Sequence, residues 1–382
     1  MAESNPLEQV SLDRLRERTS VKWRRYDPDV LPLWVAEMDV NLAPPIAEAL
    51  ERAIRAGDTG YPGSTPFVEA FTTFAAARWD WPTLDPALIR PVAGVIAGYT
   101  DALQLAAGPS GHVVVTSPVY PPFYSYLRGA GLTVAEALLT DQLRIDPDAL
   151  DSSLARARRE SPAGVAVLLC NPHNPGGTVH TRAELEQVAI IAKRHGATVV
   201  SDEIHAPLVY APAQFTPYLS VDGGGIALHS ASKAWNLAAL PGALMVFGHE
   251  AADAHATYAA SPHHWPGNFA VIAQTAAYSQ GGPWLDSLVT ALDANRHLLG
   301  SLLAEHLPAI TYLLPEATYL AWLDCTALGL GDDPAAVFLE RGRVALNSGL
   351  TFGTGGEGHV RLNFATSGAI MEEAVRRMAS VI

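Results

Sequence analysis

The sequence is poor in the residues that mark several classes of protein. Among its 382 residues only two are cysteines, Cys170 and Cys325, and each lies in an apolar segment. They lack the C-x-x-C and Cys/His spacings of zinc sites. We therefore expect two buried, reduced thiols rather than a disulfide. His263 and His264 have no third ligand at helical spacing, so we expect no metal site.

Positive charge and long apolar runs are also scarce. The chain has 25 Lys and Arg residues against 39 Asp and Glu, which gives a net charge of -14, and the basic residues form no run. Such a surface repels phosphate backbones, so we expect no nucleic-acid partner. No apolar run approaches the roughly 18 residues that cross a bilayer. The polar segment Met1–Gln9 has no apolar core of a signal peptide, so we expect a cytoplasmic protein without a membrane partner.

Hydrophobic residues make up 49% of the chain and form short runs separated by helical patterns. Thr181 with Glu184 three residues later predicts a capped helix start, and that helix should end near Gly196. Continuous apolar strands separated by helices favour an α/β fold, with a mostly parallel sheet covered on both faces. The runs that predict strands are 112–116, 164–169, 197–200, 226–228 and 243–247.

The last hundred residues follow a different pattern, because strands and helices no longer alternate regularly. This pattern favours a smaller α+β domain. We therefore expect an N-terminal segment 1–44 that contributes to the small domain and the active site, a large domain 45–282 and a small domain 283–382. The expected elements after residue 283 are helices over 284–306, 334–341 and 370–380 and strands over 312–314, 319–324, 344–346 and 360–364.

Three polar segments follow neighbouring strands of the expected sheet. Asn174 lies in an Asn/Pro/Gly loop, Asp202 ends the next strand, and Lys233 lies beyond the third, next to a serine. Ligands bind beyond the carboxyl ends of parallel strands, so we expect these side chains to meet. A Lys amine can form a Schiff base with an aldehyde, and a carboxylate can keep a pyridine nitrogen protonated. Each segment alone is an ordinary turn, cap or solvated charge, but their order and placement indicate a pyridoxal phosphate site.

The segment 91–98 supplies a candidate phosphate site. Its two glycines precede an apolar helix, whose first N–H groups and dipole favour an anion. Ser230 and Ser232 are possible hydroxyl donors to the same phosphate. Tyr120, which follows another strand, either stacks on the pyridine ring or packs at the rim of the site.

The sequence resembles fold-type I pyridoxal-phosphate enzymes of the aminotransferase class I/II superfamily, and within them the MalY/PatB branch of cystathionine β-lyases. The resemblance extends from Leu33 to Phe364. Trp-Val-Ala-Glu-Met-Asp at 34–39 and Ser-Lys-Ala-Trp-Asn at 232–236 are typical of the branch, and Asn-Pro-His-Asn-Pro-Gly-Gly at 171–177 is typical of the superfamily. The resemblance implies a large domain with a mostly parallel seven-stranded sheet, a smaller α+β domain and a pyridoxal 5'-phosphate cofactor.

The resemblance also implies roles for the residues around the cofactor ring. Lys233 would form the Schiff base and later move the α-proton of the substrate. Asp202 would pair with the pyridine nitrogen, and Tyr120 would stack on the ring. Asn174, helped by His205, would bind the ring hydroxyl oxygen.

Other matching residues would hold the phosphate. The backbone N–H groups of Val95 and Ile96, with the hydroxyls of Ser230 and Ser232, would bind it. Tyr61 would reach the phosphate of the neighbouring subunit's cofactor, which implies a homodimer with shared active sites.

The substrate would be an amino acid bound next to the cofactor. Arg361 would bind its α-carboxylate as a bidentate pair. Trp34, Tyr124 and Trp235 either line the substrate pocket or belong to the core.

These residues predict a pyridoxal-phosphate-dependent carbon–sulfur β-lyase that cleaves L-cystathionine or another L-cysteine S-conjugate to a thiol, pyruvate and ammonia. An aminotransferase is an alternative because it shares the fold and the lysine. Many aminotransferases carry Gly-Leu-Arg after the lysine, whereas the matching stretch 238–243 has no arginine, and this favours the lyase. A cofactor-bearing regulatory protein is a second alternative, for which we find no added interaction segment.

Overall fold

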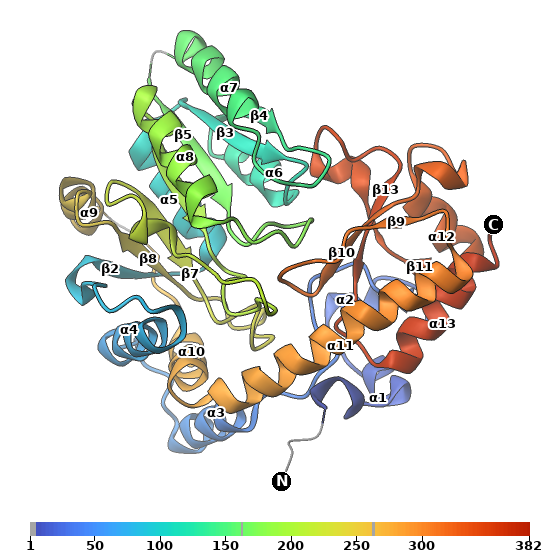
Figure 1. The fold of residues 1–382 in the computed structure, drawn as a ribbon. Helices are drawn as coiled ribbons and strands as arrows, with labels where there is room; N and C mark the ends of the chain where they lie inside the picture. The colour runs from blue at the N-terminus through green and yellow to red at the C-terminus, as the bar shows by residue number, and fades with distance from the viewer. Residues whose placement is uncertain (1–4, 162, 262–263) are drawn as a thin grey trace.

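A seven-stranded sheet forms the centre of the larger part of the molecule (Figure 1). The computed structural model describes residues 5–161, 163–261 and 264–382. The strand order is β2-β8-β7-β6-β5-β3-β4. Strand β8 runs antiparallel to both of its neighbours, and the other pairs are parallel, so the expected mostly parallel sheet is confirmed. The strands are β2 (Ile89–Val92), β3 (His112–Ser117), β4 (Thr133–Leu138), β5 (Val165–Cys170), β6 (Thr198–Asp202), β7 (Ile226–His229) and β8 (Ala243–Phe247).

Helices cover both faces of this sheet because its central strands are apolar on both sides. All six residues of β5 are buried, and they alternate between two hydrophobic clusters. One cluster lies under α5, α6 and α9, and the other includes residues of α4, α7, α8 and α10. The helices of this part are α3 (Pro44–Ala56), α4 (Thr65–Trp79), α5 (Val95–Ala107), α6 (Pro122–Gly129), α7 (Pro147–Glu160), α8 (Arg182–Arg194), α9 (Ala252–Ala259) and α10 (Asn268–Gln280).

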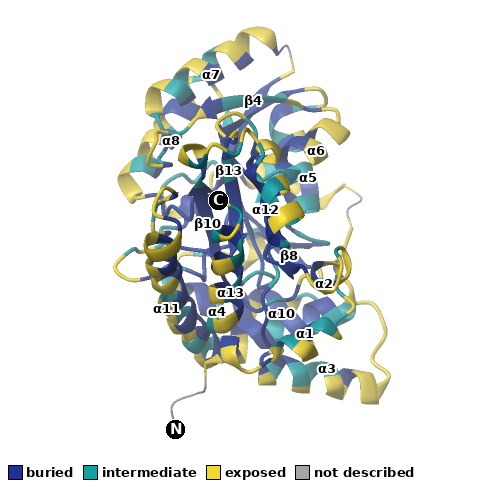
Figure 2. Ribbon diagram, turned by 90° about the vertical axis from the view of Figure 1, so that its right-hand side faces the viewer, coloured by how far each residue is buried: buried dark blue, intermediate teal, exposed yellow. Residues whose placement is uncertain are grey.

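The C-terminal residues form a smaller α+β unit, as expected. Its antiparallel sheet has the order β12-β13-β10-β9, and the long helix α11 runs beside it (Figure 1). Figure 2 shows β10 and β13 buried, whereas α11 presents exposed residues on its outer side. The elements are α11 (Gly282–His306), β9 (Thr311–Tyr312), β10 (Leu320–Asp324), α12 (Pro334–Gly342), β11 (Val344–Ala345), β12 (Asn347–Ser348), β13 (His359–Asn363) and α13 (Gly368–Ala379).

The N-terminal residues pack against the C-terminal unit. They form α1 (Leu12–Arg16), α2 (Val21–Arg24) and β1 (Leu31–Pro32), and β1 pairs in parallel with β11. Cys170 and Cys325 are buried free thiols. Across the described residues no helix is long and apolar enough to cross a membrane. The same residues contain no cluster of metal-ligating side chains, and His263 lies outside them.

Candidate active site

A cavity of about 560 Å³ lies where β5, β6 and β7 end, next to the first turn of α5. The sequence predicted a site at this edge of the sheet from the rule for parallel strands. Eight of the predicted site residues line the cavity: Val95, Ile96, Tyr120, Asn174, Asp202, His205, Ser232 and Lys233.

Asp202 ends β6 as a buried carboxyl group with little positive charge around it. Its Oδ1 accepts a hydrogen bond of 3.1 Å from the backbone N–H of Ile204. Burial raises the pKa of Asp202 to about 7, and the Ile204 N–H and the Lys233 ammonium oppose this rise only in part. A protonated ring nitrogen in the cavity would supply the missing charge.

His205 lies on the same wall and is buried as a neutral ring. Burial, reinforced by the positive charges of Lys233 and Arg361, lowers its pKa well below the ordinary value. Its Nδ1 is buried and has no hydrogen-bond partner among the described residues. A polar group of a bound molecule would satisfy this nitrogen.

Lys233 lies in the connection between β7 and β8, and its amine faces the cavity. Its Nζ donates a hydrogen bond of 3.2 Å to the carbonyl oxygen of Ala36. Burial, reinforced by the positive charge of Arg361, lowers the pKa of Lys233 to about 8, although Asp202 and Glu37 oppose part of this shift. A fraction of the amine is therefore unprotonated near neutral pH, as a nucleophile or base requires.

Arg361, on β13, joins the small sheet to the cavity wall. Its two terminal nitrogens donate to Asn174 Oδ1 at 3.2 Å and to the Trp34 carbonyl at 2.9 Å. The guanidinium lies 5.2 Å from the ring centroid of Phe352, and its Nε has no partner among the described residues. Burial lowers the pKa of Arg361 to about 10, so it stays a cation at neutral pH. A buried guanidinium with an unused donor suits a carboxylate.

The first turn of α5 points at the cavity because the helix packs closely on the sheet. A Cβ on Gly98 would lie 2.5 Å from Leu228 Cδ1 on β7, so glycine permits this approach. Val95 and Ile96 line the cavity together with Ser232, and the N–H groups of a helix's first turn have no partner within the helix. This arrangement fits a phosphate.

Ser230 does not face the cavity, contrary to the expectation from sequence. Only 2% of the residue is exposed, and its hydroxyl donates to the Gly242 carbonyl at 2.6 Å. The same oxygen accepts a hydrogen bond of 3.1 Å from the backbone N–H of Ser232. Ser230 therefore supports the turn that presents Ser232.

The segment 34–39 is fixed between the lysine loop and the small sheet. Asn236 binds the backbone N–H and the carbonyl of Met38 at 2.8 and 3.0 Å. Asn363 donates to the carbonyls of Val35 and Glu37. The segment is typical of the branch, but the roles of both asparagines were not predicted, because nothing in the sequence shows which backbone carbonyls a side chain will reach.

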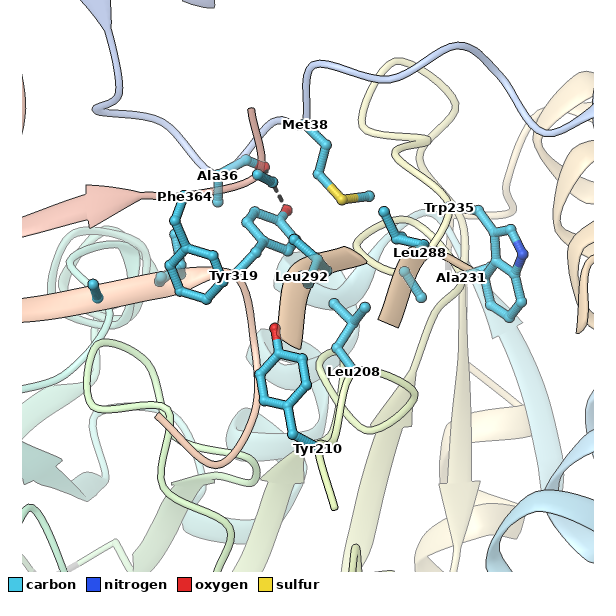
Figure 3. Close-up of a cluster of buried hydrophobic side chains, with 14 of the residues drawn as sticks. Ala36, Met38, Leu208, Tyr210, Ala231, Trp235, Leu288, Leu292, Tyr319 and Phe364 are labelled. Carbon is cyan, nitrogen blue, oxygen red and sulfur yellow. Dashed lines mark hydrogen bonds between the residues drawn. The ribbon is translucent and has the colours of Figure 1, made fainter. Parts of the chain in front are cut away.

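The Ala36 carbonyl accepts a second hydrogen bond, from the buried side of the segment. In Figure 3 the Tyr319 hydroxyl points at Ala36. This hydrogen bond to the Ala36 carbonyl is 2.9 Å long. The Ala36 carbonyl, which accepts from Lys233, is therefore also bonded to a buried tyrosine. This tyrosine lies next to Met38 and Leu292 of the core. Tyr319 was also missed from the sequence.

Two residues predicted as possible pocket walls belong elsewhere. Trp235 is fully buried; its Nε1 donates to the Gly281 carbonyl at 3.1 Å and its ring packs on Tyr278, so it is a core residue. Tyr124 lies 2.7 Å from Glu136 Oε1 and 3.1 Å from the Phe352 carbonyl, so it bonds the large sheet to the C-terminal unit.

The two remaining predicted residues lie outside the lining of this cavity. Trp34 is half-buried, packs edge-on against Tyr26 with centroids 5.9 Å apart, and contributes its carbonyl to Arg361. Tyr61 is fully exposed and borders a second, open cavity of about 1240 Å³. Pro241 lines both cavities, so the two are adjacent.

Comparisons with known proteins agree with this geometry. The profile of the family described as Aminotransferase class I and II matches residues 29–378. A Mycobacterium leprae protein with the provisional name cystathionine beta-lyase is 50% identical over 99% of this chain and 98% of its own length. Cystathionine beta-lyase PatB of Bacillus subtilis is 34% identical over 98% of this chain and 100% of its own. A crystal structure from Corynebacterium diphtheriae, provisionally titled a PLP-dependent beta-cystathionase, has a TM-score of 0.88 and 33% identity over 97% of this chain and 98% of its own.

Proposed function

The chain belongs to the aminotransferase class I and II family, and we propose that it is a pyridoxal 5'-phosphate-dependent carbon–sulfur β-lyase. Its substrate is L-cystathionine or another L-cysteine S-conjugate. The observation that carries the proposal is one cavity lined by both Lys233 and Asp202, with Arg361 bonded to Asn174 at its wall. The similarity to proteins named cystathionine beta-lyase supports the same reaction.

The cavity fits the cofactor group by group. Asp202 would carry the charge opposite the ring nitrogen, and the polar atoms without partners on His205 and Arg361 would find ligand groups. When bound, pyridoxal phosphate supplies an aldehyde for the substrate amine and a ring that accepts electron density from the α-carbon. The residues that would hold it are Val95, Ile96 and Ser232 at the phosphate, Tyr120 at the ring face, Asn174 and His205 at the ring hydroxyl, and Lys233 at the aldehyde.

The residues of the chain then act on the amino acid. Arg361 binds the α-carboxylate and fixes the orientation of the α-carbon. Lys233 Nζ, freed and unprotonated, removes the α-proton as a general base. The β-carbon–sulfur bond breaks, and the sulfur leaves as a thiolate, a good leaving group because a thiol has a pKa of about 8.5. Hydrolysis of the remaining fragment gives pyruvate and ammonia.

We also propose a homodimer in which Tyr61 reaches the phosphate in the partner subunit. Tyr61 is fully exposed, and the apolar surface beside it, which includes Leu240 and Pro241, borders the catalytic cavity. An exposed aromatic residue next to an open apolar hollow is typical of an interface.

The division into a segment 1–44, a large domain 45–282 and a small domain 283–382 remains our proposal. It is supported by the two sheets, which draw their strands from 89–247 and 311–363. We further propose a cytoplasmic location, which suits the two buried free thiols.

The test of function is incubation of the protein and pyridoxal phosphate with L-cystathionine, with and without a 2-oxo acid. We expect pyruvate and free thiol without the 2-oxo acid, measured by a coupled dehydrogenase and a thiol reagent. Amino-group transfer that requires the 2-oxo acid and releases no thiol would reject the lyase. Lys233→Ala is the control, and it should lose both the reaction and the visible absorbance of the bound cofactor.

A further inference from the structure

Glu203, which directly follows Asp202, is a buried acidic residue that the proposed chemistry does not use. Only 1% of it is exposed. Its Oε1 accepts three hydrogen bonds, from Asn171 Nδ2 at 3.3 Å, Ser201 Oγ at 3.0 Å and the Tyr218 N–H at 2.8 Å. These three donors satisfy Oε1, as burial of a carboxylate oxygen requires.

The second carboxylate oxygen of Glu203 faces a buried histidine. Glu203 Oε2 lies 3.1 Å from His229 Nε2, a close contact whose atoms are not aligned as a hydrogen bond, and His229 is itself only 1% exposed. Three aromatic rings enclose His229, with centroid distances of 4.8 Å to Phe71, 5.4 Å to Trp79 and 5.9 Å to Trp81. The packing leaves His229 little freedom to move away from Glu203.

The partners of Glu203 stand at the start of the segments that carry the active-site groups. Asn171 is the first residue after β5 and leads to Asn174. His229 is the last residue of β7 and leads to Lys233. Glu203 itself follows the last residue of β6, Asp202. One side chain therefore joins the carboxyl ends of three adjacent strands.

The backbone hydrogen bonds between these strand ends each connect only two neighbouring strands. The Asn171 N–H donates to the Asp202 carbonyl, and the Glu203 N–H donates to the Leu228 carbonyl, each at 2.9 Å. The carboxylate of Glu203 adds side-chain contacts to Asn171 and His229 at once, so it fixes the lateral spacing of the three segments.

We propose that Glu203 is a positioning residue that sets the relative placement of Asn174, Asp202 and Lys233 and thereby the affinity for the cofactor. This inference rests on the cofactor in the proposed function and is independent of which substrate is cleaved. The carboxylate acts through its hydrogen bonds and touches neither cofactor nor substrate.

The experiment is equilibrium dialysis of the holoenzyme against decreasing concentrations of pyridoxal phosphate, with bound cofactor measured from its visible absorbance. Glu203→Ala removes the contacts and should raise the dissociation constant at least about tenfold. Glu203→Gln keeps the oxygen that accepts from Asn171, Ser201 and Tyr218, so its constant should stay within about threefold of wild type.

A core truncation serves as the matched control for lost stability. Leu299→Ala removes a fully buried side chain on α11, so it should lower the unfolding temperature but leave the dissociation constant unchanged. Wild-type affinity in Glu203→Ala, or an equal loss of affinity in Leu299→Ala, would overturn the proposal. Failure of the proposed cofactor itself would look different, because wild type would then retain no pyridoxal phosphate.

Discussion

Two ionisable side chains in the cavity have pKa values brought towards neutrality by burial. Burial raises the pKa of Asp202 to about 7 and lowers that of Lys233 to about 8. Their mutual attraction opposes both shifts, but burial is the larger cause. Groups that titrate close to working pH are suited to proton transfer, and such perturbation is typical of functional sites.

The raised pKa of Asp202 predicts how stability without cofactor depends on pH. The folded protein holds a proton at Asp202 up to about pH 7, whereas an unfolded Asp releases it near its ordinary pKa of 3.8. Stability from this group is therefore lost as pH rises from about 4 to 7. Asp202→Asn removes this loss, so its free energy of unfolding relative to wild type should increase from pH 5 to pH 7 by about 1 kcal/mol or more.

Urea unfolding of the cofactor-free proteins at the two pH values measures this difference. The exposed Asp141→Asn should show no such trend. A difference between Asp202→Asn and wild type that is constant or falls with pH would contradict the assignment.

Arg361 should determine affinity for the amino acid. Arg361→Ala removes the cation that we propose receives the α-carboxylate, and losing one partner of a buried charge pair costs about 2–5 kcal/mol, so kcat/KM should fall roughly thirtyfold or more. Steady-state kinetics with L-cystathionine measure kcat/KM. Arg376→Ala, on the exposed side of α13, should keep wild-type kinetics, and an equal fall in both variants would contradict the role.

The sequence predicted which candidate residues would line the cavity but not the orientation of their neighbours. Asn174, Asp202 and Lys233 follow from strand ends alone, because parallel strands bring their carboxyl ends to one edge. The positions of Ser230, Tyr124 and Trp235 depend on tertiary contacts with Gly242, Glu136 and Gly281, which no local pattern encodes.

The elements that the sequence predicted are those with a strong local signal, and two of the missed strands have a physical explanation. The buried strands β3, β5, β6, β7 and β8 are continuous apolar runs, and the Thr181 capping box opens α8 as predicted. Strands β2 and β4 were missed because they are the two edges of the sheet. An edge strand tolerates proline or charge, and β2 contains Pro91 while β4 contains Glu136. These residues interrupt the apolar run by which a strand is predicted.

At the scale of elements, the loop between η5 (Gly349–Phe352) and β13 should be sensitive at one glycine. Gly353 has φ +88°, and a Cβ there would overlap the Tyr124 hydroxyl and Glu136 Oε1. Gly353→Ala should therefore lower the free energy of unfolding by about 1–3 kcal/mol from backbone strain alone, and further through the overlap.

Gly355 offers a matched control for this change. Its φ is +89°, yet the nearest atom to an added Cβ is Pro118 Cδ at 3.5 Å, so Gly355→Ala carries the strain without the overlap. Thermal unfolding of the two variants should show the larger loss for Gly353→Ala. Equal losses would show that Tyr124 and Glu136 simply move aside.

The proposed dimer makes a prediction for the whole molecule. If Tyr61 serves the partner's site, Tyr61→Ala and Lys233→Ala proteins should each be impaired, yet a mixed dimer would contain one site with both residues intact. After unfolding and refolding together, random pairing should recover about a quarter of wild-type activity. Sedimentation should give twice the chain mass of 40.6 kDa. No recovery on mixing would place Tyr61 and Lys233 in the same subunit's site.

The reversed strand β8 has a consequence for the role that we propose for Lys233. Because β8 begins at the edge where β7 ends, the short segment between His229 and Ala243 is anchored in buried strands on both sides. Ala231, Ala234 and Trp235 in this segment are fully buried, so packing holds its backbone and Lys233 would move mainly by its side-chain torsions. In the proposed reaction the amine would therefore act at a high effective molarity, because most of the entropy of approach is already lost during folding.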